Sequence, residues 1–236
     1  MKLFRNKKIL LIFSVLLAAF FPKNTASQTI LLDPAEFYIG PTFGVNGSMM
    51  LFSPKVLQTY QLGYTGGLAF RYITEEHFGL QVEINYSQRG FTEEGGVYSR
   101  QFNYVELPFL THYYLGDTHR FIFNLGPKLS YMFEEKVLFD DGSNPEADQR
   151  VLLADKKLDY GIAAGFGYNL HTKKMGVFQW ELRAYYGLAD VFPNTKSDFF
   201  STSNYLNASV NLGWFFQVTG RKKEIITDQP KSNKNY

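Results

Sequence analysis

Residues 206–214 alternate between large apolar side chains and small or polar ones. The apolar set is Leu206, Ala208, Val210, Leu212 and Trp214, and the other set is Asn207, Ser209, Asn211 and Gly213. A side-chain period of two predicts a β-strand whose two faces meet different surroundings. Much the same alternation recurs about eight times along the chain, and a closed sheet with large apolar residues outside is typical of a barrel that crosses a bilayer.

The N-terminus has the features of an export signal. Basic residues between Lys2 and Lys8 precede an apolar run, Ile9–Phe21, that is too short to span a membrane comfortably as a helix. Thr25 and Ser27 are small residues of the kind that signal peptidase reads, so we predict a signal peptide over residues 1–27. The alternative is a retained membrane anchor. The chain has no cysteine, which excludes a lipoprotein anchor and disulfides.

The charge of the chain changes once the predicted signal is set aside. The full sequence has 24 Lys and Arg against 22 Asp and Glu, and residues 1–27 hold five of the basic side chains and no acidic one. The remaining 19 bases and 22 acids give a net charge of −3, which argues against nucleic-acid binding. Aromatic residues make up 17% of the chain and the mean hydropathy is −0.20. A transmembrane barrel can have both a high aromatic content and a polar mean hydropathy, because only alternate residues meet lipid.

The alternating segments and the connections between them predict the topology. Strands are expected at Phe37–Asn46, Gln61–Ile73, Phe78–Arg89, Asn103–Leu115, Arg120–Phe133, Leu158–Leu170, Val177–Leu188 and Tyr205–Val218. Three connections are tight, at 74–77, 116–119 and 171–176, and four are long, at 47–60, 90–102, 134–157 and 189–204. Outer-membrane barrels have short periplasmic turns, long external loops and an even number of strands. The sequence therefore predicts an all-β fold, an eight-stranded antiparallel up-and-down transmembrane β-barrel.

This topology divides the chain into four parts. We expect a signal peptide at 1–27, a short periplasmic segment at 28–36, the barrel at 37–218 and a flexible, basic periplasmic tail at 219–236. A soluble secreted barrel is the alternative for the third part. An eight-stranded lumen barely holds its own side chains or one small ligand, so it has no room for this many Phe, Tyr, Trp and Leu side chains.

Aromatic residues near the strand ends predict two interfacial girdles. The periplasmic girdle is expected to contain Tyr72, Phe78, Tyr113, Phe121 and Phe178, and the external girdle Tyr86, Tyr131, Tyr160, Tyr186 and Tyr205.

Short motifs in the predicted strands resemble those of one family. Tyr104-Val105-Glu106-Leu107-Pro108 is similar to the tyrosine–hydrophobic–glutamate–leucine–proline signature of PorT-like outer-membrane β-barrel proteins. Gly67–Arg71, Leu80–Gly90, Asn124–Pro127 and Gly165–Tyr168 also fit that family. The resemblance spans Phe37 to Val218 and implies an outer-membrane barrel. Because the founding member belongs to a protein-secretion and gliding-associated apparatus, the resemblance implies a secretion component as an alternative role.

The same parity places charges of both signs on the inner face. These are Arg71, Glu83, Arg89, Glu106, Lys128, Glu181 and Arg183. An unpaired charge in a narrow lumen is costly, so acids and bases should pair across strands, with Glu106 facing Lys128 or Arg71. We predict that this charge network closes the bore and fixes the strand register. The alternative is a gated or selective ion path. Glu83 and Glu106 are candidates for acid–base chemistry, but the nearby cations favour neutralisation.

Catalysis is a further class of function, because lipid-modifying enzymes and proteases occur on small outer-membrane barrels. Such sites usually need a His near the external rim with Ser, Asp or Glu partners. His77, His119 and His171 fall in predicted periplasmic turns, and His112 faces inward near the same end. We therefore predict no catalytic residue and no cofactor.

Two external loops have distinctive compositions. Residues 134–157 are acidic, but the spacing around Asp140–Asn144 does not match an EF-hand, so we predict a hairpin with its tip near Gly142 rather than a metal site. Met49–Phe52 is an apolar run in an expected loop, which would fold over the barrel mouth or touch lipid or a partner.

These patterns predict a monomeric, non-catalytic barrel embedded in outer-membrane lipid, without a nucleic-acid partner. It would act as a structural or interaction protein toward a periplasmic or cell-surface protein, through its external loops or its tail. A component of a secretion apparatus is the alternative function, and a lipid-modifying or proteolytic enzyme ranks third.

Overall fold

A computed structural model of the protein describes residues 35–154, 156–192 and 199–220. The predicted signal peptide at 1–27, most of the segment at 28–36 and the predicted tail beyond Gly220 lie outside these residues. No helix of the described residues has the length and apolar character needed to cross a membrane.

Most of the described chain forms long strands. They are β1 (Glu36–Ser53), β3 (Gln61–Glu75), β4 (Phe78–Glu93), β5 (Tyr98–Leu115), β6 (His119–Asp140), β7 (Leu158–Thr172), β8 (Gly176–Gly187) and β9 (Thr202–Thr219). The connections contain a two-residue strand, β2 (Gln58–Thr59), a 3₁₀ turn, η1 (Glu94–Gly96), and a short helix, α2 (Asp148–Val151).

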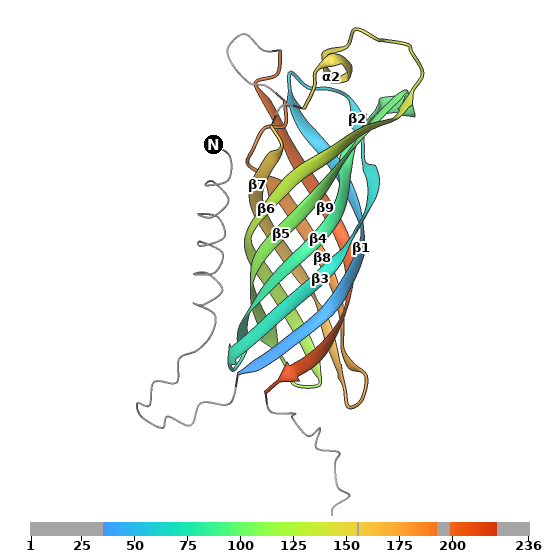
Figure 1. The fold of residues 1–236 in the computed structure, drawn as a ribbon. Helices are drawn as coiled ribbons and strands as arrows, with labels where there is room; N and C mark the ends of the chain where they lie inside the picture. Colours follow the sequence, from blue (N-terminus) through green and yellow to red (C-terminus); the bar gives the residue numbers. More distant parts are fainter. Residues whose placement is uncertain (1–34, 155, 193–198, 221–236) are drawn as a thin grey trace, which may run out of the picture. The chain divides into compact units, whose positions relative to one another are not determined.

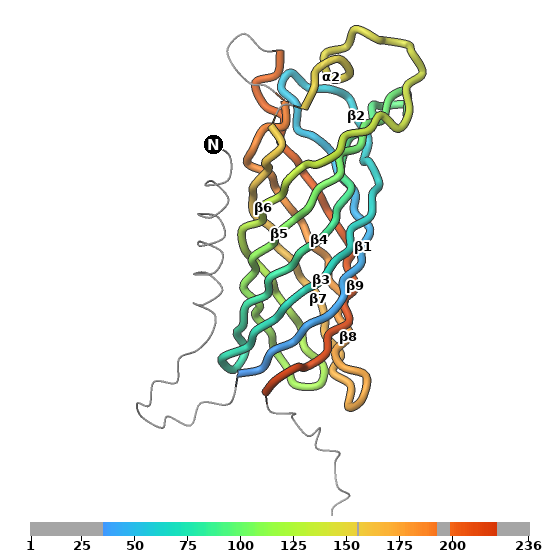
Figure 2. The backbone as a smooth tube through the Cα atoms, in the orientation of Figure 1, coloured from blue at the N-terminus to red at the C-terminus, as the bar shows by residue number. Residues whose placement is uncertain are grey.

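The eight long strands close into a ring (Figures 1 and 2). Their order is β4-β3-β1-β9-β8-β7-β6-β5, and β5 pairs back to β4. All neighbours are antiparallel, and the first and last strands meet in a seam that runs from Phe37↔Thr219 to Ser53↔Thr202. The eight-stranded antiparallel up-and-down barrel predicted from the alternation is confirmed.

Alternation decides which side chains face outward. Each strand presents large apolar side chains that are exposed, among them Phe43, Tyr64, Leu80, Phe109, Phe123, Ile162, Leu182 and Leu212. The residues between them are buried in the lumen and are mostly polar, charged or glycine. This arrangement is the reverse of a soluble protein and matches a barrel wall that is solvated by lipid.

Glycines let neighbouring strands approach closely inside the narrow barrel. A Cβ atom on Gly126 would lie 2.0 Å from the carbonyl oxygen of Phe109, and one on Gly167 would lie 2.1 Å from that of Trp180. A side chain at either position would push adjacent strands apart, so the inner face needs glycine there.

The connections define two ends of the barrel. At the turn end, residues 76–77, 116–118 and 173–175 link β3 to β4, β5 to β6 and β7 to β8. The opposite end, the loop end, carries the other connections and α2 (Figure 1). Short turns are periplasmic in outer-membrane barrels, so the predicted topology has the loop end on the outside.

Several predicted boundaries at the loop end were wrong because the strands continue beyond their predicted ends. Met49–Phe52 lie in β1, paired to β9, rather than in a loop. The expected long loop at 90–102 is a hairpin with only residues 94–97 between its strands. The acidic loop begins after Asp140 rather than at Glu134, and β9 starts at Thr202. Tyr205, predicted in the external girdle, is fully buried in the lumen.

Candidate functional site: the charged lumen and its aromatic closure

Arg89 is the centre of an ion cluster in the loop-end half of the lumen. Its guanidinium donates to the carboxylate of Glu106, through Nε at 2.7 Å, and through Nη1 to Oδ2 of Asp159 at 2.7 Å. Lys128 Nζ donates to the second oxygen of Glu106 at 3.1 Å. The side chains of Arg89 and Asp159 are 0% and 2% exposed. Two cations therefore neutralise two buried carboxylates, which is the condition for holding charge away from water.

Aromatic rings complete the surroundings of this cluster. The Arg89 guanidinium lies over the ring of Tyr104 at 4.7 Å and over that of Tyr185 at 4.8 Å. The Tyr185 hydroxyl donates to Asp159 at 2.9 Å, and Lys128 Nζ lies 3.7 Å from the Tyr185 ring centroid. Cation–π contacts of this kind strengthen as water is excluded. They fix the guanidinium on its faces while the carboxylates fix it at its edges.

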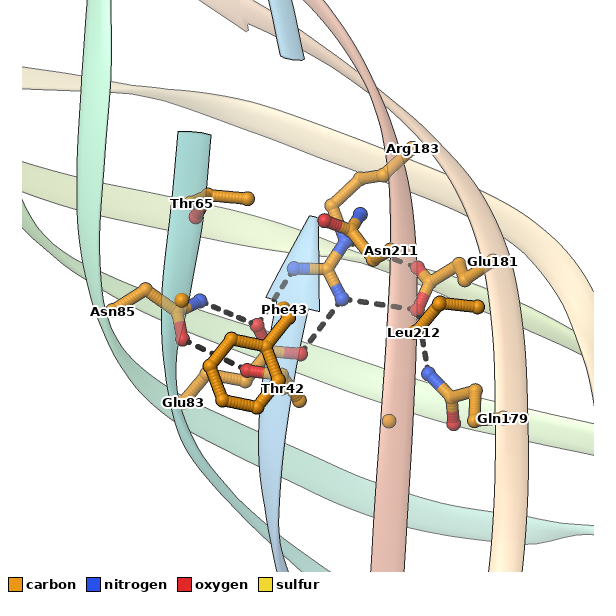
Figure 3. A pocket seen from close by; sticks show the side chains of 12 residues that line it. Thr42, Phe43, Thr65, Glu83, Asn85, Gln179, Glu181, Arg183, Asn211 and Leu212 are labelled. Atoms are coloured by element: carbon orange, nitrogen blue, oxygen red, sulfur yellow. Dashed lines mark hydrogen bonds and ion pairs between the residues drawn. The ribbon is translucent and has the colours of Figure 1, made fainter. Parts of the chain in front are cut away.

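Arg183 holds a second cluster nearer the turn end, between Glu83 and Glu181 (Figure 3). It donates two hydrogen bonds of 2.7 Å to the two oxygens of Glu83 and two of 3.0 Å to Glu181. The parallel pair to Glu83 is the bidentate geometry that makes arginine–carboxylate pairs strong and directional. Amide side chains of Gln81, Asn85 and Gln179 donate to the remaining carboxylate positions. Glu83 and Glu181 are therefore fully engaged and are not poised for acid–base chemistry.

Arg71 lies beyond this cluster, toward the turn end. It donates to the amide oxygen of Gln81 at 2.9 and 2.7 Å and to that of Gln179, and its guanidinium lies 4.1 Å from the Phe215 ring centroid. Within the described residues it forms no ion pair. The predicted alternative of an Arg71–Glu106 pair is therefore wrong. Glu106 is instead paired with Lys128, as the other alternative had it, and with Arg89.

An aromatic cluster fills the mouth at the loop end. Phe52 contacts Phe91 at 5.3 Å, Phe200 at 4.7 Å and Phe192 at 5.9 Å between ring centroids. Phe102 lies in the same cluster, and each of the five rings is at most 8% exposed. Ser203 Oγ accepts hydrogen bonds from the backbone N–H groups of Val191 and Phe192, which secures the connection that carries two of the rings. We call these five phenylalanines the aromatic closure.

The voids beside the two ion clusters of the lumen are small. Two voids of about 10 and 20 Å³ lie beside the Arg183 and Glu106–Lys128 clusters. A void of that size holds about one water molecule. A hydrated ion needs a continuous wet path, which voids of this size do not provide.

Two arginines anchor the connection between β6 and β7 over the closure. Arg100 donates to the carbonyl oxygens of Gln149 and Leu152, at 3.1 and 2.8 Å, and pairs with Glu135. Arg150, on α2, pairs with Glu93 at 2.6 Å and with Asp140 at 3.0 Å. The hydrogen bonds to Glu93 raise the pKa of the Arg150 guanidinium above its ordinary value. The acidic loop thus supplies carboxylates to arginines, and the described residues hold no group of three His, Asp or Glu suited to a metal ion.

All seven charges predicted for the inner face lie in the lumen. The structure groups Arg89, Glu106 and Lys128 in one cluster, Glu83, Glu181 and Arg183 in another, and places Arg71 apart from both. The sequence analysis missed further buried charges, among them Asp159 and Arg120. Asp159 alternates with the outward residues Leu158 and Tyr160, and Arg120 precedes outward Phe121, so parity is the signal that could have found both.

The histidines occupy the turn end. His112 is fully buried, with Nδ1 2.7 Å from Oδ1 of Asn124. His77 lies in the β3–β4 turn, His119 begins β6 and His171 lies near the end of β7. None of the four is at the loop end, where the long connections would receive an external substrate.

Comparisons with known proteins give the family of this barrel and several solved structures that resemble it. Residues 26–193, well over half of the chain, match the profile of the family described as "Outer membrane protein beta-barrel domain". No curated protein matches the chain. OprG of Pseudomonas aeruginosa is similar in structure, with a TM-score of 0.49, 13% identity, and coverage of 78% of this chain and 97% of that one. Ail of Yersinia pestis, solved with the heparin analogue sucrose octasulfate, has a TM-score of 0.41, 13% identity, and coverage of 77% and 99%. Neisserial surface protein A has a TM-score of 0.44, 9% identity, and coverage of 77% and 99%.

Proposed function

This chain belongs to the outer membrane protein beta-barrel domain family, and we propose that in the bacterial outer membrane it serves as a closed, non-catalytic barrel that acts on other proteins through its external surface. We propose further that it works as a monomer in outer-membrane lipid and is of the PorT-like type. Its partner would be a cell-surface or periplasmic protein.

One observation supports the closed barrel above all others. The Arg89 cluster crosses the bore from β4 to β7, and the aromatic closure fills the mouth above it. A conducting pore would require water around these charges, whereas the Arg89 and Glu106 side chains are 0% and 6% exposed. If solutes cannot pass through the lumen, the outer wall of the barrel and its loop end are the surfaces through which the protein can bind others.

The residues behind the PorT-like resemblance build the lumen. In the motif Tyr104–Pro108, Tyr104 lies against Arg89 and Glu106 binds both Arg89 and Lys128. A motif with this role identifies how the barrel is packed, and it carries no recognition surface of its own. The motif therefore supports the type of barrel more strongly than it supports the alternative role in a secretion apparatus.

The enzyme reading ranks third because of where the reactive side chains lie. Glu83, Glu106 and Glu181 are engaged by cations and amides, and the four histidines lie at the turn end. A hydrolase would need a nucleophile, a base and an orienting group within hydrogen-bonding reach. No such trio lies at the loop end within the described part of the chain.

Planar-bilayer recording combined with crosslinking in cells tests the proposal. Purified protein should show no sustained open conductance, and it should release neither acyl chains from lipid A nor fragments from peptides. A photoreactive residue at Leu153 should crosslink to a surface or extracellular protein, whereas one at Lys174 serves as the matched turn-end control. A steady open pore would refute the closed barrel. Crosslinks confined to Lys174 and to periplasmic secretion proteins would favour the alternative.

A further inference from the structure

One edge of β6 has no strand partner above the barrel wall. β6 pairs with β7 only from His119↔Leu170 to Tyr131↔Leu158, and the backbone N–H of Met132 then donates to Lys157 at 2.7 Å. Residues 134–140 continue as a strand paired with β5 alone. Among the described residues, no other strand or loop bonds to their second edge. Figure 1 shows this part of β6 projecting at the loop end beside β5.

The free edge is also apolar. Val137, Leu138 and Phe139 are consecutive and are 56%, 50% and 54% exposed. Val137 and Phe139 pair with consecutive residues of β5, Arg100 and Ser99, and therefore point to opposite faces, so the edge is apolar on both sides. Exposed edges of this kind attract other strands, and proteins normally blunt or cover them. The loop after Asp140 leaves it open, because α2 is tied to Glu93 on β4 and Ala154 packs into the closure cluster.

We infer that this edge of β6, residues 134–140, is the docking site for an extended basic segment of an extracellular protein, which adds to the sheet as a further strand. This inference rests on the proposed external role and names its surface and partner chemistry. Strand addition combines backbone hydrogen bonds along the edge with side-chain contacts to alternate residues. Both elements are present, as unpaired backbone groups and as the three apolar side chains.

The charge of the residues around the edge indicates which kind of segment can bind there. Residues 134–148 contain six acidic side chains and one basic side chain, Lys136. Arg100 and Arg150 pair with Glu135 and Asp140, which still leaves the segment acidic. A second copy of the chain is a poor occupant, because antiparallel pairing centred on Val137 would set Glu134 opposite Asp140. Like charges directly opposite each other destabilise a strand pair, whereas lysine or arginine on the incoming strand would stabilise it.

Peptide binding to the folded, full-length protein in detergent tests the inference. The probe is a short capped fluorescent peptide that alternates valine and lysine, and fluorescence anisotropy measures its affinity. The informative variant is Leu138→Pro. Leu138 lies in a bulge without a β5 partner, between Arg100↔Val137 and Ser99↔Phe139, so proline there breaks no β5–β6 pair while it removes the exposed Leu138 side chain from the edge. Losing this apolar contact should weaken the peptide by about tenfold.

Leu153→Pro is the matched control. Leu153 is 77% exposed and lies off the edge, and the preceding residue, Leu152, already has the extended backbone that proline requires before it (φ −66°, ψ 132°). This variant should bind the peptide as the parent does. With the parent protein, a peptide N-methylated at every residue should not bind, since neither of its edges can donate hydrogen bonds. A peptide that alternates valine and glutamate should bind more weakly than the lysine peptide.

The N-methylated peptide keeps the test decisive even if Leu138→Pro fails to fold, which the folded band on unboiled gels will show. No binding of the lysine peptide to the parent overturns the inference, as does equal binding of the N-methylated peptide. Equal binding of the glutamate peptide overturns the basic character of the occupant. A parent that neither binds the peptide nor conducts ions leaves the proposed function standing without this site, whereas an open pore overturns the proposed function whatever the peptide does.

Discussion

The Nη1 atom of Arg89 lies 2.7 Å from Oδ2 of Asp159, in an ion pair that joins β4 to β7 through the interior of the barrel. These strands are not neighbours in the ring, because β5 and β6 lie between them. Ladder hydrogen bonds hold only adjacent strands together. The Arg89–Asp159 pair therefore adds a link across the bore that the ladder cannot supply.

Glu106→Gln should lower the thermal stability of the barrel. The substitution removes the carboxylate that pairs with Lys128 and one of the two carboxylates that pair with Arg89. Breaking a buried ion pair costs about 3–5 kcal/mol of folding stability. On unboiled gels, the folded band should convert to the unfolded one at a lower temperature than in the parent. Lys174→Gln, at an exposed position of a turn, is the control and should convert with the parent. A Glu106→Gln protein as heat-resistant as the parent would mean that the inner face is wet.

Arg183→Gln should destabilise the second cluster, and a second substitution should restore part of the loss. Without the guanidinium, Glu83 and Glu181 remain as two buried carboxylates with only amide partners. Adding Glu83→Gln removes one of these charges, so the double variant should melt above the single variant by the same gel assay. If Glu83→Gln instead lowers the melting temperature further, the two unpaired carboxylates are not the cause of the loss in the single variant.

Phe192→Ala should open the aromatic closure without melting the barrel. Phe192 is fully buried against Phe52 and Phe200, and truncating a buried phenylalanine costs about 3–5 kcal/mol. The loss falls on the β8–β9 connection, so limited proteolysis there should speed up while the folded gel band keeps the temperature of the parent. Phe199→Ala, at a neighbouring ring that is 52% exposed, should be cleaved like the parent.

Gly126→Ala should impair assembly more than any substitution at an exposed glycine of the wall. The added methyl group would lie 2.0 Å from the carbonyl oxygen of Phe109, which forces β5 and β6 apart. Gly47→Ala is the control, because its methyl group would be 3.8 Å from the nearest atom of Tyr60. The yield of heat-modifiable protein in isolated outer membranes measures the effect, and equal yields for the two variants would contradict it.

The sides of the membrane can be tested with inserted tags. A protease-resistant epitope after Gly142, where a Cβ atom would meet nothing within 4 Å, should bind antibody on intact cells. The same epitope at Lys173 should bind antibody only after the outer membrane is permeabilised. Reversed or equal labelling would invert the assignment of ends and bring the turn-end histidines into contact with the outside.

The wall of the barrel could be predicted from the sequence because lipid imposes one strict rule. Where one face meets hydrocarbon and the other the lumen, alternation reports both the strand and its orientation, as residues 206–214 do. The rule lapses above the bilayer, where both faces of a strand can be covered by protein. Residues 98–104 of β5 are buried at every position, so their pattern resembled a loop and the strand was predicted to begin at Asn103.

The members of the charge network could also be predicted, but their pairing could not. The alternation of side chains assigns a residue to the lumen. Which residue it pairs with depends on the register of the strands, that is, on how far along the barrel axis each side chain lies. Glu106 and Lys128 lie on neighbouring strands in nearly matching register, since Pro108 is opposite Lys128. Arg71 lies two strands away from Glu106 and at a different height, beside Gln81 and Gln179. Nothing in a single sequence fixes those heights.

Stable insertion into the membrane requires the final strand, because only β9 closes the ring by pairing with β1. A chain that ended after Gly187 would keep seven long strands, but β1 and β8 would each expose a full edge of N–H and C=O groups to hydrocarbon. Each unsatisfied group costs several kcal/mol in that medium, so no truncated ring can reside stably in the bilayer. The β1 edge must therefore be covered by other polar groups until residues 202–219 pair with it.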